Sequence, residues 1–295
     1  MRLVATARQE SKITVGVACV PGATGAEPPP DVEPLPGTEP PPDVEPLRSA
    51  EAPPAAADIF GSVFPLAQRY ANMLATDGII RGLIGPREAA RLWDRHLLNC
   101  AVVADLVPRP ATLMDVGSGA GLPGIVLAML LPDVQVTLLE PMARRVEFLD
   151  ECRAGLDLRN VTVRRGRAEE VRGQVRADVI TARAVAPLDR LAGLAIPLVR
   201  PGGMVLALKG QRAAAEADAA GPALRRLDVS DVAVLSVGVG KISPVATVVR
   251  LIASTTPTGS AGPAGSVGSA GSAGARARRR ARLGAAHGKA AQPPR

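Results

Sequence analysis

The chain has few of the residues that build disulfide, metal or membrane proteins. Its 295 residues include three cysteines, two histidines and 2% aromatic residues. Cys19, Cys100 and Cys152 have neither disulfide nor metal-ligand spacing, which excludes a disulfide scaffold and predicts no metal site. No apolar run approaches the roughly 20 residues of a membrane span, and the run 13–20 is a poor secretion signal. We therefore expect a cytoplasmic protein that does not enter a membrane.

Proline, glycine and net charge, in contrast, concentrate at the two ends. Residues 1–55 carry a net charge of −4 and repeat one proline-rich nonapeptide, at 27–35 and 39–47. Residues 254–295 are rich in glycine, alanine and serine and carry a net charge of +7. The proline-rich, acidic composition of residues 21–55 favours extended, solvated chain, and residues 254–295 have nothing to bury. We therefore predict a disordered extension 1–55, one domain 56–253 and a disordered basic tail 254–295. The arginine run 276–282 suits either a phosphate-binding arm or a solubilising tail.

The most informative segment is 113–124, which reads LMDVGSGAGLPG. It has the order of an apolar strand, a glycine-rich turn and a helix opened by Pro123. Glycine lets the backbone come close to a ligand, and free N–H groups at a helix start favour polar acceptors or negative charge. The segment therefore predicts a nucleotide-type site.

Two nucleotides compete for this site. Gly119, Gly121 and Gly124 satisfy G-x-G-x-x-G with Glu140 following 21 residues after Gly119, which formally fits a dinucleotide. Asp115, however, would repel a pyrophosphate and suits a ligand that carries an ammonium and a sulfonium. S-adenosylmethionine (SAM) carries both groups, and Glu140 would then accept hydrogen bonds from its ribose. SAM is favoured, and an NAD-binding oxidoreductase stays as an alternative.

Strand and helix patterns alternate along the domain, which predicts an α/β fold with a mostly parallel seven-stranded sheet. The expected strands after the first are 134–139, 161–163, 178–181, 204–208 and a closing antiparallel pair, 232–237 and 245–252, with helices at 142–156 and 187–199. Ligands of such sheets lie beyond the carboxyl ends of the strands. Asp115, Glu140, Glu169 and Arg183 all fall there.

An N-terminal helical extension precedes the sheet. A packing stripe predicts one helix over 59–74, and a second is expected from Pro86 through Leu106. Arg87, Arg91 and Arg95 follow at i, i+4 and i+8, which gives one cationic face. Such a face is either solvated or bound to phosphate.

Five motifs occur together in one order. They are RHLLNC at 95–100, DVGSGAGLPGI at 115–125, RRVEFL at 144–149, TARA at 181–184 and ALKG at 207–210. On these motifs residues 58–253 closely resemble the RsmG family, also called glucose-inhibited division protein B. The resemblance implies a Rossmann-like SAM-dependent methyltransferase fold. It also implies an enzyme that methylates N7 of a guanine in the 16S rRNA of the small ribosomal subunit.

The resemblance implies a set of site residues. Cofactor contacts carried over by position are Gly117, Leu122, Ala168, Glu169 and Arg183, to which the turn itself adds Gly119 and Glu140. Arg183 is expected to brace the cofactor and to face the RNA. Arg95, His96 and Lys209 are the candidate RNA contacts. No residue is expected to act as acid or base, because guanine N7 carries no proton to remove.

Other methylation chemistries fit less well. Exocyclic amines go with an Asn/Asp-Pro-Pro-aromatic motif after the fourth strand, where this chain has TARAVA at 181–186. A pyrimidine C5 requires a cysteine nucleophile, whereas Cys100 and Cys152 lie in helical patterns. A non-catalytic RNA-binding module on the same fold remains an alternative, and we expect a monomer.

Overall fold

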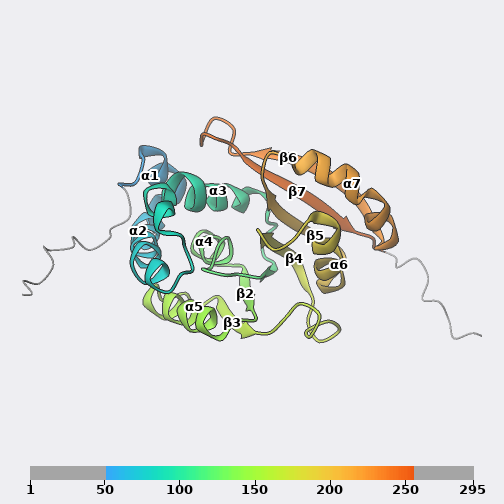
Figure 1. Ribbon diagram of the computed structural model, residues 1–295, viewed down its shortest axis with the longest axis horizontal. Helices are drawn as coiled ribbons and strands as arrows, with labels where there is room; N and C mark the ends of the chain where they lie inside the picture. Colours follow the sequence, from blue (N-terminus) through green and yellow to red (C-terminus); the bar gives the residue numbers. More distant parts are fainter. Residues whose placement is uncertain (1–50, 256–295) are drawn as a thin grey trace, which may run out of the picture. The chain divides into compact units, whose positions relative to one another are not determined.

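In a computed structural model, residues 51–255 are described; most of the predicted N-terminal extension and nearly all of the basic tail lie outside them. The described part is built on a seven-stranded sheet of order β3-β2-β1-β4-β5-β7-β6 (Figure 1). Its strands are Thr112–Val116 (β1), Gln135–Glu140 (β2), Val161–Arg165 (β3), Ala177–Arg183 (β4), Val199–Lys209 (β5), Val229–Val237 (β6) and Ala246–Ala253 (β7).

The first five strands are parallel, and β7 runs antiparallel to both β5 and β6. The predicted fold class is therefore confirmed, including the closing antiparallel pair. The strand order reverses between β1 and β4, so Asp115 pairs with Leu138 of β2 on one side and with Thr181 of β4 on the other. In open α/β sheets the crevice at such a switch point is where ligands bind.

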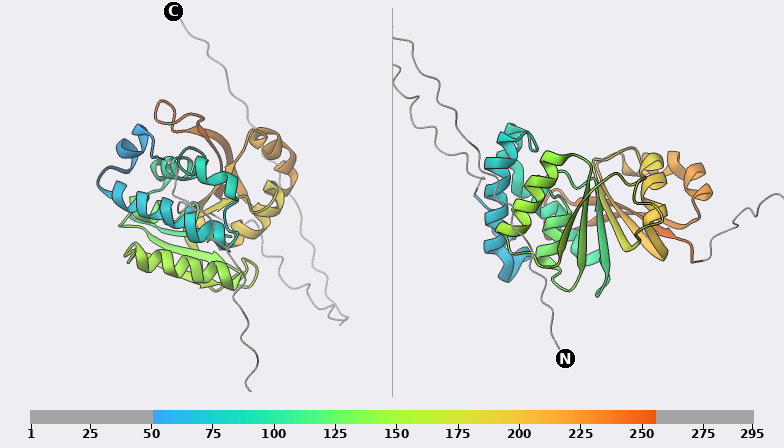
Figure 2. Two further views of the ribbon diagram at one scale, coloured as in Figure 1. Left: turned by 60° about the vertical axis from the view of Figure 1, so that its left-hand side comes forward. Right: turned by 90° about the horizontal axis from the view of Figure 1, so that it is seen from below.

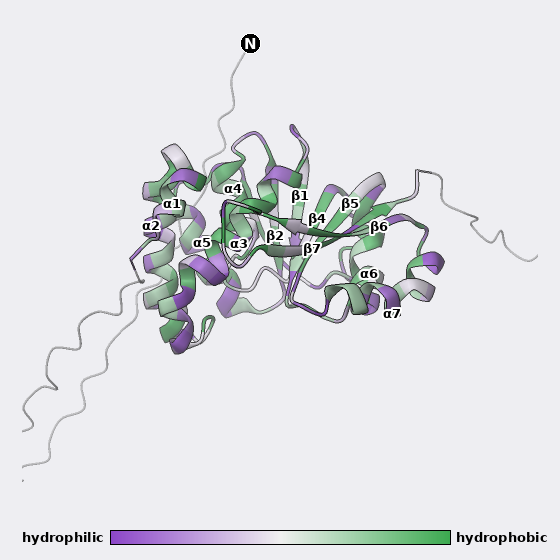
Figure 3. Cartoon of the chain, turned by 90° about the horizontal axis from the view of Figure 1, so that it is seen from above, coloured by the Kyte–Doolittle hydropathy of each residue, from purple (hydrophilic) through white to green (hydrophobic). Residues whose placement is uncertain are grey.

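Helices cover both faces of the sheet (Figure 2). The helices are Pro54–Phe60 (α1), Phe64–Met73 (α2), Leu98–Ala101 (α3), Gly124–Leu130 (α4), Ala143–Gly155 (α5), Leu188–Ala195 (α6) and Ala213–Arg226 (α7). The first five pack on one face, and α6 and α7 pack on the other. Figure 3 shows apolar residues gathered on the strands and on the helix sides that face them. No helix of the described residues has both the length and the apolar character to cross a membrane.

The segment expected to be one helix, Pro86 to Leu106, is helical over that whole range but is not a single regular α-helix. The segment forms a 3-10 turn (Pro86–Arg91), a π-helical turn (Leu92–Leu97), α3 and a second 3-10 turn (Val102–Leu106). In a π turn the backbone hydrogen bonds join residues i and i+5, whereas in an α-helix they join residues i and i+4. The π turn thereby brings Leu92, Trp93, Leu97 and Leu98 to the same buried side. Trp93 packs there against Phe60 at 6.1 Å between ring centroids and against Phe64 at 5.9 Å.

Three local features are not evident from the sequence pattern. Met142 directly precedes α5 and is 41% exposed, while Phe148 and Cys152 fill the core. Residues 201–203 lie inside β5 rather than in a turn before it, and a Cβ on Gly203 would lie 2.5 Å from the Asp178 carbonyl oxygen. Helix α7 was missed because its buried face is mostly alanine and shows little apolar periodicity.

Asn160 links the end of α4 to the start of β2. Its Nδ2 donates to the carbonyl oxygens of Ala128, Leu131 and Val134 at 3.0–3.1 Å. We predict that Asn160→Ala lowers the free energy of unfolding by about 1–3 kcal/mol, because partly buried carbonyl groups lose their donor. Urea denaturation measures the change. Arg159→Ala is the control, since its ion pair with Asp157 is exposed and should contribute little; equal stability of the two variants would contradict the prediction.

Candidate functional site

The glycine turn after β1 is held tightly against its neighbours. Gly117 N and Ser118 N donate to the Leu139 carbonyl oxygen of β2 at 2.9 and 3.2 Å. Gly121 has φ +96°, and a Cβ there would lie 2.8 Å from the Tyr70 hydroxyl. A Cβ on Gly124 would lie 2.9 Å from the Asp115 carboxyl group. Glycine is therefore required at both positions by close packing beneath the turn, and at Gly121 also by backbone conformation.

The Asp115 carboxyl group lies beneath this turn and is completely buried. Thr181 Oγ1 donates to its Oδ1 at 2.7 Å, and Gly124 N donates to its Oδ2 at 3.2 Å. Burial raises the pKa of Asp115 from 3.8 to about 6, partly offset by these hydrogen bonds. The expectation that Asp115 faces a cationic ligand is thus not met in this structure. Its oxygens instead join β1, β4 and the first N–H of α4, a group that was itself expected to face the ligand.

Glu140 ends β2 directly beside the turn, as its position in the sequence predicts. Its Oε2 accepts a hydrogen bond from Gly119 N at 2.9 Å, and its Oε1 accepts one from Met142 N at 3.1 Å. The guanidinium of Arg145 lies 3.7 Å from Oε1, and Glu140 is only 1% exposed. A carboxylate oxygen can accept two hydrogen bonds. Both oxygens therefore keep acceptor capacity beyond the bonds that hold the turn, although the carboxylate is almost closed off from solvent in this structure.

The segment after β3 lies at the same edge. Gly166 N donates to the Glu140 carbonyl oxygen at 3.2 Å, which brings the loop to the end of β2. In this loop Ala168 is buried and Glu169 is exposed. Leu122 is buried in the glycine turn, where its N–H lies 3.3 Å from the Ser118 carbonyl oxygen. The predicted cofactor residues from β1, β2 and β3 therefore gather at one edge of the sheet.

Tyr70, which the sequence reasoning did not single out, supports the turn from α2. Its hydroxyl donates to the Ala120 carbonyl oxygen at 2.7 Å, and the ring is fully buried. Burial raises the pKa of Tyr70 well above its usual value, so the hydroxyl stays a donor at all physiological pH values. Tyr70 is the only tyrosine of the chain. Its being the single tyrosine is the one feature of the sequence that could have drawn attention to Tyr70.

Arg183, at the end of β4, meets residues of the helical extension. Its Nη2 donates to the Arg95 carbonyl oxygen at 3.1 Å and lies 2.7 Å from His96 Nδ1, and its Nη1 contacts Cys100 Sγ at 3.5 Å. His96 Nε2 in turn lies 2.7 Å from Glu88 Oε2. The structure thus brings three predicted residues, Arg95, His96 and Arg183, together with Glu88, which the sequence reasoning missed. Nothing in the sequence pattern distinguished Glu88 from a solvated residue.

A cavity of about 890 Å³ opens beside this cluster. Its lining includes Arg91, Arg95, Asn99, Arg183 and Lys209. Lys209 is already engaged, because its Nζ lies 2.8 Å from both the Ala186 carbonyl oxygen and Glu216 Oε2. The cavity is therefore cationic and lies at the carboxyl ends of β4 and β5.

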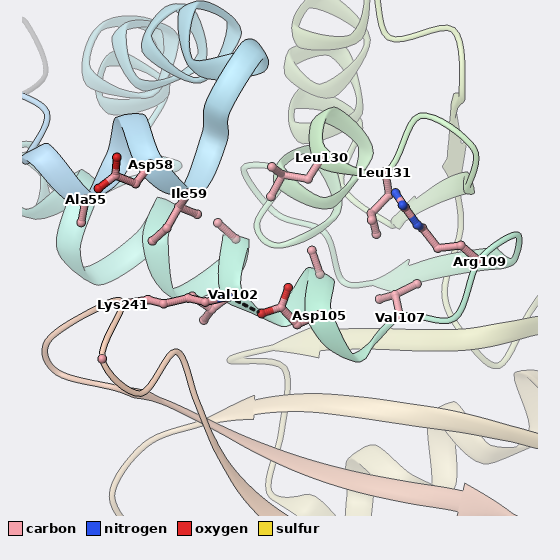
Figure 4. A pocket seen from close by; sticks show the side chains of 13 residues that line it. Ala55, Asp58, Ile59, Val102, Asp105, Val107, Arg109, Leu130, Leu131 and Lys241 are labelled. Atoms are coloured by element: carbon pink, nitrogen blue, oxygen red, sulfur yellow. Dashed lines mark hydrogen bonds and ion pairs between the residues drawn. The ribbon is translucent and has the colours of Figure 1, made fainter.

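A second cavity, of about 760 Å³, lies between α1, the segment 101–109 and the loop before β7 (Figure 4). Lys241 Nζ forms an ion pair of 2.8 Å with Asp105 at this cavity. None of the predicted site residues lines it. Within residues 51–255, no group of three or more histidine, cysteine, aspartate or glutamate side chains is placed to hold a metal ion.

The burial of Asp115 predicts a pH dependence of stability. A folded-state pKa of about 6 against an unfolded value of 3.8 means that the folded chain binds the proton more tightly. This contribution is fully present below about pH 4 and is lost as the pH rises through 6. We expect wild type to lose up to about 3 kcal/mol relative to Asp115→Asn between pH 4 and pH 7. Urea denaturation of both proteins across this range measures it; parallel pH profiles would contradict the burial of a titrating carboxyl group.

Known proteins resemble this chain over the same residues. The family model described as "rRNA small subunit methyltransferase G" (GidB) matches residues 64–242. Ribosomal RNA small subunit methyltransferase G of Thermobifida fusca is 58% identical over 201 residues, which is 68% of this chain and 85% of the relative. The protein of the same name from Salinispora tropica is 47% identical over 239 residues, or 79% of this chain and 90% of the relative.

Among solved structures, a SAM-dependent O-methyltransferase of Thermotoga maritima matches with a TM-score of 0.45 and 13% identity, covering 55% of this chain and 67% of that one. The sequence relatives and the family model confirm the resemblance seen in the five motifs. The chain belongs to the rRNA small subunit methyltransferase G family.

Proposed function

We propose that this protein transfers a methyl group from SAM to N7 of a guanine in the 16S rRNA of the small ribosomal subunit. One observation carries the proposal. A glycine turn with a carboxylate beside it and an arginine-lined cavity lie at the same edge of one sheet. Family membership supports the reaction class. The activity is assigned to the predicted domain 56–253, acting as a monomer in the cytoplasm, where ribosomes are found.

The residues of the turn fit SAM. Glu140 would accept hydrogen bonds from the ribose hydroxyls while it holds Gly119 N. A Cβ on Gly117 would lie 3.0 Å from Val185, so glycine keeps the backbone open between the turn and the β4 loop. Leu122, Ala168 and Glu169 would border the adenosine. When bound, SAM would supply a methyl group carried on a sulfonium. The sulfur that loses this methyl group becomes a neutral thioether.

Arg183 would serve both halves of the site. Its position at the end of β4 lies between the glycine turn after β1 and the cavity. Arg95 and Lys209 remain proposed RNA contacts, although Lys209 also anchors the loop at Ala186 and would have to share its ammonium with a phosphate. Both ring nitrogens of His96 are already hydrogen-bonded, so any effect of His96 on RNA would pass through Arg183.

The proposed chemistry requires positioning rather than proton transfer. The N7 lone pair forms the new bond to carbon as the carbon–sulfur bond breaks, and the bonding electrons stay on sulfur. No proton leaves N7, so no general base is needed. Holding the base in line with the methyl group and excluding water supply the acceleration. Buried Asp115 and Tyr70 act on the shape of the turn, not on the reacting atoms.

The direct test is transfer of tritiated methyl from SAM to small-subunit rRNA taken from cells that lack this protein, followed by mapping of the modified base. We supply the RNA free, in assembly intermediates and in the intact subunit. One N7-methylguanine in the 16S rRNA supports the proposal. SAM binding without transfer to any of these forms would overturn it in favour of a non-catalytic module. Binding of NADH instead of SAM would revive the oxidoreductase.

The role of Glu140 gives a prediction on cofactor affinity. We expect Glu140→Ala to weaken SAM binding at least about tenfold, because a charge-assisted hydrogen bond is worth about 1.5–3 kcal/mol. Calorimetric titration with SAM measures the change. Glu147→Ala, an exposed substitution on α5, is the control. Unchanged SAM affinity of the Glu140 variant would remove the ribose role.

The role of Arg183 gives a prediction on turnover. We expect Arg183→Ala to abolish detectable methyl transfer while the chain stays folded, since the side chain is only partly buried and lines a cavity. Circular dichroism and the transfer assay measure the two parts. Arg176→Ala removes an exposed arginine at the opposite end of the same strand and should retain activity. A fully active Arg183 variant would contradict the assignment.

A further inference from the structure

Three side chains, Glu88, His96 and Arg183, are hydrogen-bonded in series, in a line that leads to the cavity of about 890 Å³ that Arg183 lines. We call this cavity the acceptor cavity. Glu88 Oε2 lies 2.7 Å from His96 Nε2, and His96 Nδ1 lies 2.7 Å from Arg183 Nη2. Glu88 comes from the 3-10 turn Pro86–Arg91, His96 from the π turn Leu92–Leu97 and Arg183 from the end of β4. The line therefore ties the helical extension to the sheet at the point where the proposed acceptor binds.

The direction of each hydrogen bond in this line follows from chemistry. A guanidinium can only donate, so Arg183 Nη2 donates and His96 Nδ1 accepts. In a neutral ring the proton then lies on Nε2, which donates to the Glu88 carboxylate. Burial lowers the pKa of His96, and the positive charge of Arg183 lowers it further, so the neutral ring is the favoured form. The carboxylate and the guanidinium thus select one tautomer.

The arrangement occupies three donors of the guanidinium and leaves two available. Arg183 has five N–H donors, and His96, the Arg95 carbonyl oxygen and Cys100 Sγ account for three. Among residues 51–255 no partner is recorded for the other two. Because Arg183 also lines the cavity of about 890 Å³, those two donors can meet a substrate.

We propose that Glu88 and His96 are positioning residues that hold the Arg183 guanidinium in the acceptor cavity, with His96 acting only as a neutral acceptor. The proposal rests on the proposed function for what Arg183 meets there. Glu88 anchors the ring, the ring anchors the guanidinium, and neither Glu88 nor His96 touches the reacting atoms.

Protonation of His96 would break the line. An imidazolium has no acceptor at Nδ1 and would place a second positive charge against Arg183. The groups that face His96 are Glu88, Arg95 and Arg183, with the buried Cys100 thiol behind the guanidinium. Activity should therefore fall as the pH drops through the His96 pKa, which lies below 6.5. Asp115 titrates nearby, so only the difference between variants assigns the effect.

Nitrogen-15 NMR of the histidine rings tests the line without any assay of activity. The chain has two histidines, and His287→Ala leaves His96 as the single ring signal. We expect the Nε2–H tautomer at pH 7, a rise of the His96 pKa in Arg183→Ala and a fall in Glu88→Gln. A ring that titrates like a free histidine, or one unaffected by Arg183→Ala, would overturn the proposal.

Kinetics of matched variants test the consequence. Glu88→Gln keeps an acceptor for Nε2–H and should retain turnover within about threefold, whereas Glu88→Ala should lose about tenfold in kcat with the KM for SAM unchanged. His96→Asn places an oxygen where Nδ1 lies and cannot titrate. It should keep part of the activity and lose the fall that wild type shows at acid pH, while His96→Ala should lose most activity.

The outcomes separate this inference from the proposed function. If wild type methylates rRNA but Glu88→Ala matches it, or His96→Asn keeps the full acid fall, the positioning pair is wrong and the function stands. If wild type transfers no methyl group while the NMR results hold, the proposed function fails and the line remains as a description of the site.

Discussion

The buried carboxyl group of Asp115 joins the parts of the site. It accepts a hydrogen bond from Thr181 on the neighbouring strand and another from the first N–H of α4, while its own strand pairs with β2. These bonds set the separation of β1 and β4 at the point where strand order reverses. That separation positions the glycine turn, which lies above Asp115. It also positions Arg183, which follows Thr181 by two residues on β4. Burying a carboxyl group costs free energy unless it is hydrogen-bonded. The hydrogen bonds of Asp115 offset this cost and fix the geometry where β1, β4 and α4 meet.

The sequence was enough to predict the sheet and the meeting of the glycine turn with Glu140 at one of its edges, because both depend on local patterns. Glycines after one strand and Glu140 after the next had to meet if the strands are parallel neighbours, and they do. The rest depends on partners remote in sequence. Tyr70 bonds to a residue 50 positions away and His96 to one 87 positions away, so no local pattern marks them. The π turn at Leu92–Leu97 likewise comes from tertiary burial of Trp93, which overrides the i→i+4 period.

The helical extension is therefore part of the candidate site as well as a cover for one face of the sheet. One of its helices supplies the hydroxyl that supports the glycine turn, and its irregular segment supplies the groups around Arg183. Its irregularity has a structural use, since 3-10 and π turns change which side chains face inward within a few residues. Glu88 and His96 are eight residues apart, yet His96 contacts the Arg183 guanidinium and Glu88 contacts His96.

The order of the strands also bears on how the chain is made. Strand β7, the last in the part of the chain that the structure describes, lies between β5 and β6 and pairs with both. The edge of β5 that faces β7 therefore has no partner until residues 247–252 have been synthesised. Val205 and Ala207 on that edge are fully buried in the finished protein. A nascent chain that ends short of β7 exposes an unpaired apolar strand, which is the kind of edge that recruits other chains. Completion of the sheet thus waits on translation of the final strand, and premature termination there yields an aggregation-prone product rather than a smaller working enzyme.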